Sequence, residues 1–527
     1  MANILGSLSG TDKTHARKAA IYCKTIDGAS SAGVGCNVTE MRSRQHGRTR
    51  SLTKRRIKMK TRRVTGWLSA FIPLLMLGAG AADIARGASL SVTNDGSDSP
   101  SCGAASAPCR SISQAIENAS NGDSIFVGAG QYGDLTGNGS FTGPGDERPG
   151  PMPVGISTGC VICITKAVRI YSLHGAAVTV IHAPPQPNWY NAVIGIVHDG
   201  VTFGAVNEGF TITGGNRFGV LAAGQCDVGA QTGWVTKVSV LGNVDVEDNI
   251  GFAFLGQLGP AACPEPAPVL LASNTAVDNS GGGFQVEVNN HRGPVHMQEN
   301  KALRCGVGFS VDPGSLNEDI GFAADNVQLS GNVATHCNYG FVTSRAGNIQ
   351  FNTAAGNRTA GFWVTPMVGE SAVGQGFGPV PPPKVVFTGN SAIGNGGPGA
   401  VIVYEPDNEG FSVPPTFAGF ASFSRNNFYG NDRSRPAGLT IGEVGFKLGA
   451  GARCGVLNAG SFSSFASGDF PLGHAVNLRA TDNFWGSSSG PQAGGVGDNA
   501  GGACDKNGGV TSFKPVATTP FGITSLP

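Results

Sequence analysis

The sequence predicts an all-β fold, a right-handed parallel β-helix (a solenoid of stacked coils) with a short capping helix at its N-terminal end. Three observations predict it. Gly supplies 82 of 527 residues and only 13% of residues are charged, which favours a repetitive β architecture over a helical bundle or a disordered chain. Short β-branched strands recur between Gly and Asn turns. A motif that joins an Asn to a Gly-Phe pair repeats from about residue 200 onward.

Residues 59–82 have the pattern of a signal peptide. Basic residues precede an apolar stretch that contains Pro73 and ends in the small residues 79–82. Signal peptidase and the translocon require this order of positive, apolar and small-residue regions. We therefore expect an exported protein, in the periplasm, at the cell surface or in the extracellular space, with no membrane span after cleavage, because the apolar stretch is short and contains glycines.

Residues 1–58 form a basic leader without a fold pattern. They contain 12 Lys and Arg against 3 Asp and Glu, and translation from Met41 or Met59 is an alternative to a genuine leader. From Ser89 onward, 20 Lys and Arg stand against 31 Asp and Glu, a net charge of −11. An acidic folded part repels nucleic acid and anionic membranes, so we expect no nucleic-acid partner.

Cysteine usage agrees with export. Ten of the twelve cysteines follow residue 82, an even number that suits an oxidising compartment. Cys102 and Cys109 enclose a short loop and are the first expected disulfide. Cys160 and Cys163 form a C-x-x-C motif, but no second such motif or His pair completes a zinc site.

The folded part is expected over residues 89–515, with a C-terminal tail over 516–527. It begins with a helix over 111–119, since apolar residues recur there at helical spacing. A strand over 124–127 follows the Asn121-Gly122 turn, and further short strands are expected near 168–171 and 177–181. A helix at this place covers the apolar side chains and strand edges at the end of an open stack.

The central repeat reads approximately N-x-A-x-x-N…G-F-x-V. Its clearest copies start at Gly209, Gly251, Gly283, Gly308, Gly340 and Gly361, with looser copies at Gly399 and Gly438. A single unit has too little apolar surface to fold alone, so copies must stack as parallel strands with Asn residues hydrogen-bonded along the stack. The predicted inward rows are Phe252, Phe284, Phe309, Phe341, Phe362 and Phe254, Val286, Val311, Thr343, Val364.

The same register places Cys305 and Cys337 on adjacent coils, because each lies three residues before its Gly. Adjacent coils are about 4.8 Å apart, which falls within the Cα separation that a disulfide allows. We expect either a bridge or a stacked pair of thiols.

Three segments carry a resemblance that extends from about Ser89 to Gly502. They are the entry segment 102–116 with 121–127, the Asn…Gly-Phe repeats, and Asn483-Phe-Trp-Gly486 with Ser489-Gly-Pro491. In these the chain resembles bacterial right-handed β-helix repeat proteins of the pectate-lyase-like superfamily. The resemblance implies the fold and export; it does not imply an activity, because the superfamily includes lyases, hydrolases and binding proteins.

The polysaccharide hydrolases of this superfamily share acidic motifs that are incomplete here. Asn274-Thr-Ala276 and Asn352-Thr-Ala354 have Ala where a carboxylate would be needed, and the chain has no adjacent Asp pair. The Arg-Ile-Lys motif occurs only at 56–58, within the leader. No complete hydrolase or lyase signature is present, and the sequence favours a protein that is not an enzyme.

One outward strip is the candidate site. The fourth residue after each repeat Gly aligns Glu287 with Asp312, and two carboxylates on adjacent coils could share Ca²⁺, the cofactor that lyases on this fold use. An exposed Trp offers a flat surface to a sugar ring. The catalytic candidates are Glu287, Asp312 and Arg345; Glu287 and Asp312 are also the metal candidates, and the ligand-binding candidates are Trp363, Tyr404, Glu405, His291 and Arg292.

Three functions compete. The leading hypothesis is a non-catalytic protein whose partner is a polysaccharide or a cell-surface glycan. The alternatives are a polysaccharide lyase, or a hydrolase, acting on acidic polysaccharide, and a structural adhesion stalk. An enzyme requires convergence of carboxylates with an Arg, a binding protein requires exposed aromatics without it, and a stalk requires neither. The sequence leaves the oligomeric state open.

Overall fold

A computed structural model of the chain divides into two compact units, Met1–Ala82 and Asp83–Pro527. In the first unit β1 (Ile21–Lys24) pairs antiparallel with β2 (Gly35–Val38). No helix in the part of the chain that is described is both long and apolar enough to cross a membrane. The structure describes residues 21–24, 35–38, 87–135, 139–152, 159–183, 190–224, 238–256, 268–287, 294–312, 327–344, 347–365, 385–404, 420–433, 452–463, 470–471, 476–491 and 497–522.

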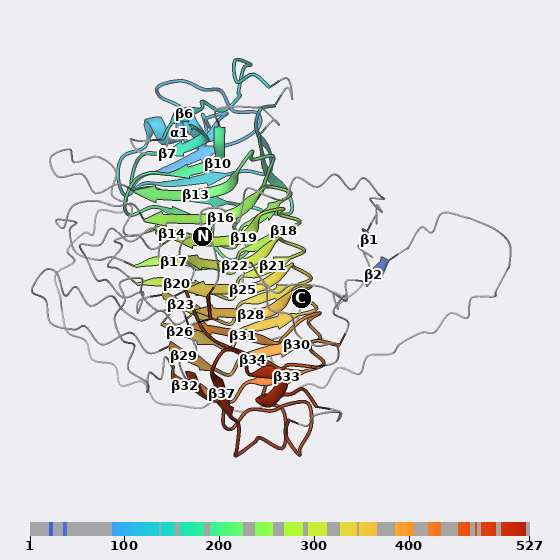
Figure 1. The fold of residues 1–527 in the computed structure, drawn as a ribbon. Coiled ribbons are helices and arrows are strands. Elements are labelled where there is room, and N and C mark those ends of the chain that lie inside the picture. The colour runs from blue at the N-terminus through green and yellow to red at the C-terminus, as the bar shows by residue number, and fades with distance from the viewer. Residues whose placement is uncertain are drawn as a thin grey trace, which may run out of the picture. The chain divides into compact units, whose positions relative to one another are not determined.

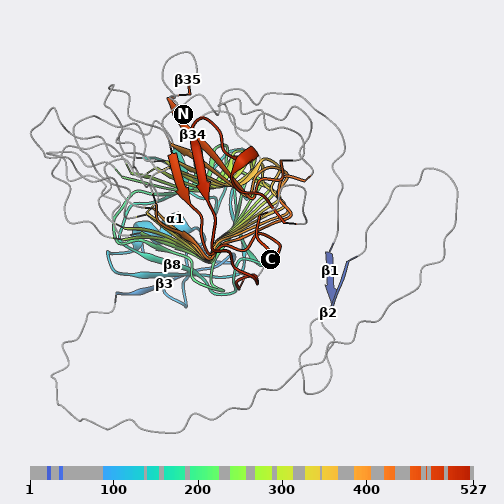
Figure 2. The same ribbon diagram turned by 60° about the horizontal axis from the view of Figure 1, so that its bottom comes forward.

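The second unit is a parallel β-helix, as the sequence predicts. Three long sheets run along it, and the central coils each contribute one strand to each sheet (Figure 1). Figure 2, which brings the C-terminal end forward, shows the strands of successive coils stacked behind one another. Strands in neighbouring coils pair parallel; the exceptions in these three sheets are β6 with β7 and β34 with β35, at opposite ends of one sheet.

The twelve-stranded sheet contains β6 (Gly150–Pro151), β7 (Gly159–Ile164), β10 (Tyr190–Ile196), β13 (Phe218–Gly224), β16 (Ile250–Gly256), β19 (Gly282–Glu287), β22 (Val307–Asp312), β25 (Tyr339–Ser344), β28 (Ala360–Thr365), β31 (Ala400–Tyr404), β34 (Val456–Ser463) and β35 (Phe470–Pro471). The eleven-stranded sheet contains β3 (Ser89–Val92), β4 (Ser124–Val127), β8 (Arg169–Ser172), β11 (Thr202–Phe203), β14 (Val238–Leu241), β17 (Val269–Ala272), β20 (Val295–Gln298), β23 (Val327–Ser330), β26 (Asn348–Gln350), β29 (Val385–Thr388) and β32 (Phe420–Ser424). The ten-stranded sheet contains β5 (Gly130–Gly133), β9 (Thr179–His182), β12 (Thr211–Thr213), β15 (Val244–Val246), β18 (Thr275–Val277), β21 (Lys301–Leu303), β24 (Val333–Thr335), β27 (Thr353–Ala355), β30 (Ser391–Ile393) and β33 (Asn427–Tyr429).

The predicted inward rows are confirmed. The five Phe residues from Phe252 to Phe362 pair coil by coil and are fully buried, with stacked rings 4.7–5.0 Å apart. The row two residues later, from Phe254 to Val364, is also buried. The register that the Gly-Phe motif predicts therefore holds over five coils.

One of the copies that looked clear in the sequence, at Gly209, needs correction. Gly209-Phe210 precedes β12 in the ten-stranded sheet, and the residue that aligns with Phe252 in that coil is Val220. The motif match was misleading because Phe210 is also buried in the core, but it lies next to the ten-stranded sheet and not in the twelve-stranded sheet that contains the Phe row. Gly399 is in register, since Ala400 pairs with Phe362. Gly438 lies outside the described residues.

The Gly of the motif is required by close approach between coils. A Cβ atom placed on Gly251, Gly283, Gly308, Gly361 or Gly399 would lie 2.5–2.9 Å from the carbonyl oxygen of the corresponding Gly one coil later. Real Cβ atoms do not come this close to backbone, so a larger residue would force adjacent coils apart. The Ala of the motif faces the same space: the Cβ of Ala302 would lie 2.9 Å from a Cβ on Gly283.

The Asn residues of the motif form a buried ladder. In each coil the backbone N–H of this Asn donates to Oδ1 of the Asn in the next coil, at 2.8–3.0 Å. The residue before each Asn has a positive φ of 54–72° and makes the turn between two sheets; these residues are Gly242, Ser273, Glu299, Gly331, Phe351, Gly389, Arg425 and Asp482. The ladder consists of Asn243, Asn274, Asn300, Asn332, Asn352, Asn390, Asn426 and Asn483.

A second ladder follows the ten-stranded sheet, one turn later in each coil. Its members are Asp248, Asn279, Cys305, Cys337, Asn357, Asn395, Asn431 and Asp498, and the described bonds again run from a backbone N–H to the side chain of the next coil. The ladder ends on the carboxylate of Asp498, which accepts from Asn431, while the backbone N–H of Asp498 donates to the carbonyl oxygen of Trp485. Burial raises the pKa of Asp498 to about 6.

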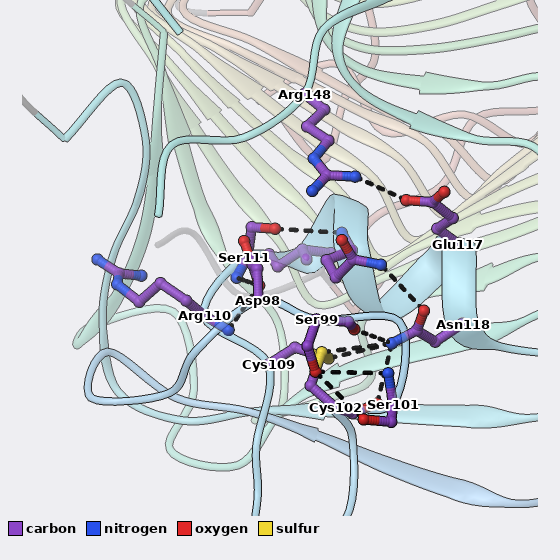
Figure 3. Close-up of a disulfide and its surroundings, with 12 residues drawn as sticks. Asp98, Ser99, Ser101, Cys102, Cys109, Arg110, Ser111, Glu117, Asn118 and Arg148 are labelled. Carbon is purple, nitrogen blue, oxygen red and sulfur yellow. Dashed lines mark hydrogen bonds and ion pairs between the residues drawn. A yellow bond between two sulfur atoms is a disulfide. The ribbon is translucent and has the colours of Figure 1, made fainter. Parts of the chain in front are cut away.

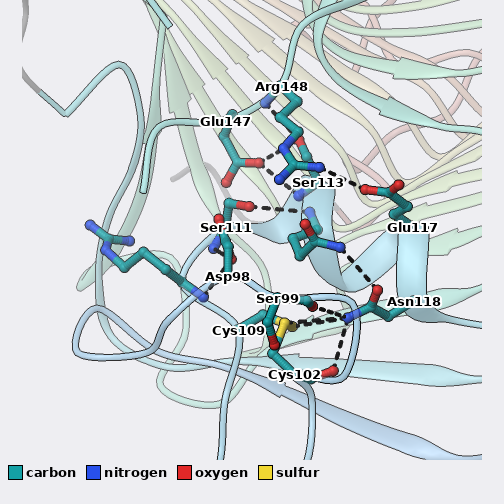
Figure 4. A network of polar contacts seen from close by, with 12 residues as sticks. Asp98, Ser99, Cys102, Cys109, Ser111, Ser113, Glu117, Asn118, Glu147 and Arg148 are labelled. Carbon is teal, nitrogen blue, oxygen red and sulfur yellow. Dashed lines mark hydrogen bonds and ion pairs between the residues drawn. A yellow bond between two sulfur atoms is a disulfide. The ribbon is translucent and has the colours of Figure 1, made fainter. Parts of the chain in front are cut away.

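The N-terminal end is closed by α1 (Ile112–Asn118), the predicted cap. Ser111 caps it by accepting from the N–H of Gln114, and Glu147 accepts from the N–H groups of Ile112 and Ser113 (Figure 4). Burial raises the pKa of Glu147 to about 7, although these hydrogen bonds oppose the shift. The segment around Glu147 is therefore held against the capping helix.

Three disulfides are present among the described cysteines. Cys102 is bonded to Cys109, the predicted pair, beside the side chain of Asn118 (Figure 3). Cys160 is bonded to Cys163, so in this state the C-x-x-C motif is a disulfide within β7, and Cys454 is bonded to Cys504 of the 3₁₀ turn η2 (Gly502–Cys504).

The C-terminal segment packs on the last coils. β36 (Val476–Arg479) and β37 (Gly509–Ser512) pair parallel. Val516 packs against the core, and the backbone of Phe521 makes two hydrogen bonds with the side chain of Asn427. The described part of the expected tail, residues 516–522, thus covers the C-terminal end of the stack.

Candidate functional site

The outward strip predicted from the register lies on the twelve-stranded sheet. Leu255 pairs with Glu287, and Glu287 with Asp312, in three successive coils; Ser344 pairs with Thr365 further along. The backbones at Glu287 and Asp312 are therefore one coil apart, about 4.8 Å. The sequence correctly placed these two acids next to each other.

Glu287 has polar neighbours on its own strand and on the following coil. Its side chain is half-buried, and its Oε1 accepts a hydrogen bond of 2.6 Å from Nε2 of Gln285. Gln285 pairs with Ser310 in the next coil. We call Gln285, Glu287, Ser310 and Asp312 the central polar strip; the side chain of Asp312 lies outside the described residues.

Apolar clusters adjoin the strip on both sides along the sheet. Toward the N-terminus, Phe218, Leu221, Ile250 and Ala253 are buried in one cluster, and toward the C-terminus a second cluster contains Trp363, Val401 and Leu457. The outward row that begins at Leu221 and Ala253 becomes polar at Gln285 and Ser310, and apolar again at Val342 and Trp363. In this row the strip is thus a polar segment between two apolar ones.

Trp363 does not offer the exposed ring that the sequence led us to expect. Only 8% of the residue is exposed, and its ring lies edge-on to Tyr339 with centroids 6.3 Å apart. The same cluster contains both cysteines of the Cys454–Cys504 disulfide. The prediction of exposure was wrong because it treated an outward position on a strand as a solvent-facing position, whereas this part of the outer face is covered.

The remaining candidates cannot be placed against the strip. Arg345, His291, Arg292 and Glu405 lie outside the described residues. Tyr404 ends β31 and its backbone pairs with Ser461, but its side chain is also outside them. Convergence of an Arg with the two acids stays a prediction.

The Ca²⁺ site at Glu287 and Asp312 also stays a prediction. Within the described parts of the chain, the group that satisfies metal-ligand spacing is Asp98, Cys102 and Cys109. Both sulfur atoms there belong to a disulfide, and Oδ1 of Asp98 accepts from the N–H groups of Arg110 and Ser111. Those bonds explain the cluster without a metal ion.

The two Ala residues that interrupt hydrolase-like motifs face the interior. Ala276 and Ala354 are fully buried at the centres of β18 and β27. A carboxylate at either position would point into the core rather than toward a substrate. The structure therefore provides no catalytic acid at these two places.

One coil does have a carboxylate at this core position, which the sequence motifs did not indicate. Asp245 pairs with Ala276 in the ten-stranded sheet and is fully buried; Asp248, 2% exposed, follows at the next turn. Nδ2 of Asn279 donates to Oδ2 of Asp245 at 2.8 Å. Burial and repulsion from Asp248 hold the pKa of Asp245 well above its usual range, and burial raises that of Asp248 to about 6.

The buried acids are a core feature and not part of the central polar strip. The signal that could have found them is the alignment of Asn243-Val-Asp245 with Asn274-Thr-Ala276, which replaces the Ala of the repeat by Asp. Two adjacent buried carboxyls are stable only when they share a proton or bind a cation, since both cannot ionise in a medium of low polarity.

Comparison of the chain with protein-family models, with curated proteins and with solved structures gave no match.

Proposed function

We propose that this chain is an exported member of the pectate-lyase-like superfamily that binds a glycan through the central polar strip without cleaving it. The observation that carries the proposal is the alignment of Glu287 with Asp312, and of Gln285 with Ser310, on one polar segment of the outer face. Carboxylate, amide and hydroxyl groups at coil spacing are the groups that hydrogen-bond sugar hydroxyls along an extended polymer.

Charge divides the candidate glycans into two classes. A neutral glycan would bind the strip directly through hydrogen bonds to Glu287 and Gln285. An acidic glycan would be repelled by the carboxylates unless Ca²⁺ joined its own carboxylates to Glu287 and Asp312. Binding of acidic polysaccharide that requires Ca²⁺, or binding of neutral polysaccharide that does not, would support the proposal.

The test is a binding titration of the purified full chain with neutral and acidic polysaccharides, each with and without Ca²⁺. Glu287→Gln and Asp312→Asn should weaken binding about 10-fold or more, since a hydrogen bond to a charged group contributes about 1.5–3 kcal/mol. Glu299→Gln, which removes an exposed acid at a corner outside the strip, should not. No binding to any glycan, or equal losses in all three variants, would contradict the proposal.

A polysaccharide lyase is the second candidate, because the same pair of acids would hold the Ca²⁺ that acidifies a uronate. Absorbance of unsaturated product, followed in the same titrations, distinguishes it. Product formation that Glu287→Gln abolishes would replace the binding proposal by the lyase. If neither product nor binding is observed, a structural stalk is the function that remains.

A further inference from the structure

Two cysteines in the middle of the solenoid are unbonded. Cys305 and Cys337 are free and buried, with 3% and 1% of each residue exposed, whereas the other six cysteines described in the second unit all form disulfides. Of the two alternatives that the sequence left open, the structure has the stacked thiols. Their state therefore differs from that of every other described cysteine in the β-helix.

Both thiols occupy positions of the second ladder, where Asn279 precedes them and Asn357 follows. The backbone N–H of Cys305 donates to Sγ of Cys337 at 3.3 Å. In most other coils of this ladder the same bond goes to the side-chain oxygen of an Asn or Asp. The contacts from the two sulfur atoms to backbone carbonyls are long, 3.5–3.8 Å. A thiol is a weak donor and acceptor, so Cys serves the ladder less well than Asn.

The geometry suits a bond between them. Val307 and Tyr339, two residues after each Cys, are paired across adjacent coils, and the sheet spacing is about 4.8 Å. The disulfides already formed in this protein have Cα separations of 4.9, 5.4 and 5.7 Å. A bond between stacked coils therefore requires no large backbone movement.

The surroundings allow a thiolate to form. Arg304, the residue before Cys305, lies at the exposed corner and is paired with Asp278 at 2.6 and 2.8 Å. The hydrogen bond from Cys305 lowers the pKa of the Cys337 thiol, with a smaller contribution from Arg304, while the pKa of Cys305 is raised by that bond and by burial. The Cys337 sulfur also accepts the backbone N–H of Cys305, a contact that favours a thiolate there, so we take Cys337 as the attacking group.

We propose that Cys305 and Cys337 are a redox-reactive pair that closes to a disulfide joining two adjacent coils. The Cys337 thiolate attacks an organic disulfide and releases one organic thiolate. The Cys305 thiolate then attacks Sγ of Cys337 and releases the second. The protein gives up two electrons and two protons, and the organic disulfide is reduced to two thiols.

Cys305 precedes β22, which contains Ser310 and Asp312 of the central polar strip, and Cys337 precedes β25. The bond would therefore join the second coil of the strip to the coil that follows it. It would close a segment of 32 residues. Such a link stabilises chiefly by restricting the unfolded chain. This inference does not depend on glycan binding, and its test contains no glycan.

The test starts from reduced, unfolded protein, so that burial does not limit access to the thiols. The chain is refolded over a range of oxidised-to-reduced glutathione ratios, then acidified, alkylated after unfolding, digested and measured by mass spectrometry. We expect the 305 and 337 peptides to be joined, in a fraction that rises with the proportion of oxidised glutathione. Both should be alkylated only at the reducing end of the range.

Two variants supply the controls. C305N/C337N introduces the Asn that flanking coils carry at this position, so it should fold and retain the other disulfides. The melting temperature of the wild type should be several degrees higher in the oxidising buffer than in the reducing buffer. This difference should exceed the one measured for C305N/C337N. C305N alone should give no joined peptide. The proposal fails if both thiols remain alkylated at every ratio, or if each is recovered bonded separately to glutathione.

Discussion

Asp245 is a residue at which this chain departs from its own repeat. In the two coils that follow, the same inward position is Ala, which leaves room for the Gly of the adjoining sheet, and in the coil before it is Ile212. Here the carboxylate of Asp245 occupies the space in which a Cβ on Gly219 would lie. The only partners of the buried Asp248 carboxyl among the described residues are the Asp245 carboxyl and the backbone N–H groups of Gly214 and Gly215, so the two acids have few donors for four oxygen atoms. Buried polar atoms without partners are destabilising.

We predict that Asp245→Ala stabilises the protein at neutral pH by about 1–3 kcal/mol. Asn279 would lose its bond to the carboxylate, but Nδ2 of Asn357 and of Asn395 bonds the backbone oxygen of the Ala at this position, and Asn279 could do the same. Urea unfolding near pH 7.5 measures the change. Glu208→Ala, which removes an exposed acid one coil earlier, should have little effect.

The gain should depend on pH. Because the folded-state pKa values of Asp245 and Asp248 are raised, the folded protein binds these protons more tightly than the unfolded chain does. The wild type is therefore most stable with respect to this pair below about pH 4 and loses that stability as the pH rises through about 6. The advantage of Asp245→Ala should shrink on acidification; a constant or growing advantage would contradict the assignment.

Local patterns predicted some residues well and others poorly. Phe252 and its partners were predictable because every inward position of the row requires an apolar side chain that can stack, and such residues are visible in the sequence at a regular spacing. Trp363 was mispredicted because exposure of an outward residue depends on what covers the sheet, which lies far away in the sequence. Asp245 was overlooked because a single Asp within a repeat looks like an ordinary turn acid until the register is known.

At the scale of elements, the two ladders position the turns. Each corner needs a residue with positive φ, followed by a side chain that satisfies the backbone of the coil before it. Asn fulfils this because its amide both donates and accepts. Asn332 shows the complete set, accepting from the N–H and Nδ2 of Asn300 and donating to the oxygen of Met297 and to Oδ1 of Asn352.

Asn332→Ala should destabilise the protein by about 3–5 kcal/mol, since it leaves several buried donors and acceptors without partners. Asn338→Ala provides the matched control: Asn338 lies six residues later at the next corner and is exposed. Thermal unfolding of both variants measures the difference. Comparable small losses in both would mean that the ladder does not stabilise the stack.

The capping helix and the Asn spacing were visible in the sequence because each has a local signature. The second ladder was only partly visible, since it mixes Asp, Asn and Cys at one structural position. Residue type alone does not reveal that Cys337 and Asn357 do the same work at successive corners. The shared feature is the residue before them, His336 and Gly356, whose φ is positive.

At the scale of the whole molecule, stacking brings together residues that are distant along the chain. Glu287 and Asp312 are 25 positions apart and become direct neighbours because every coil closes at the same two corners. The fold was predictable because the same motif of Asn, Ala and Gly-Phe occurs in successive coils, so each copy supports the same register. The site was less predictable, since the loops between strands vary in length and sequence from coil to coil.

The most direct test of this account measures whether positions 287 and 312 are neighbours on the outer face. E287C/D312C, made in the C305N/C337N background, should form a disulfide readily with oxidised glutathione, because the two backbones are paired in adjacent coils. E287C/T365C, whose positions lie three coils apart, should not. Efficient cross-linking of the first variant alone is the predicted result. No cross-link in the first variant, or equal cross-linking in both, would contradict the register on which the fold and the proposed site depend.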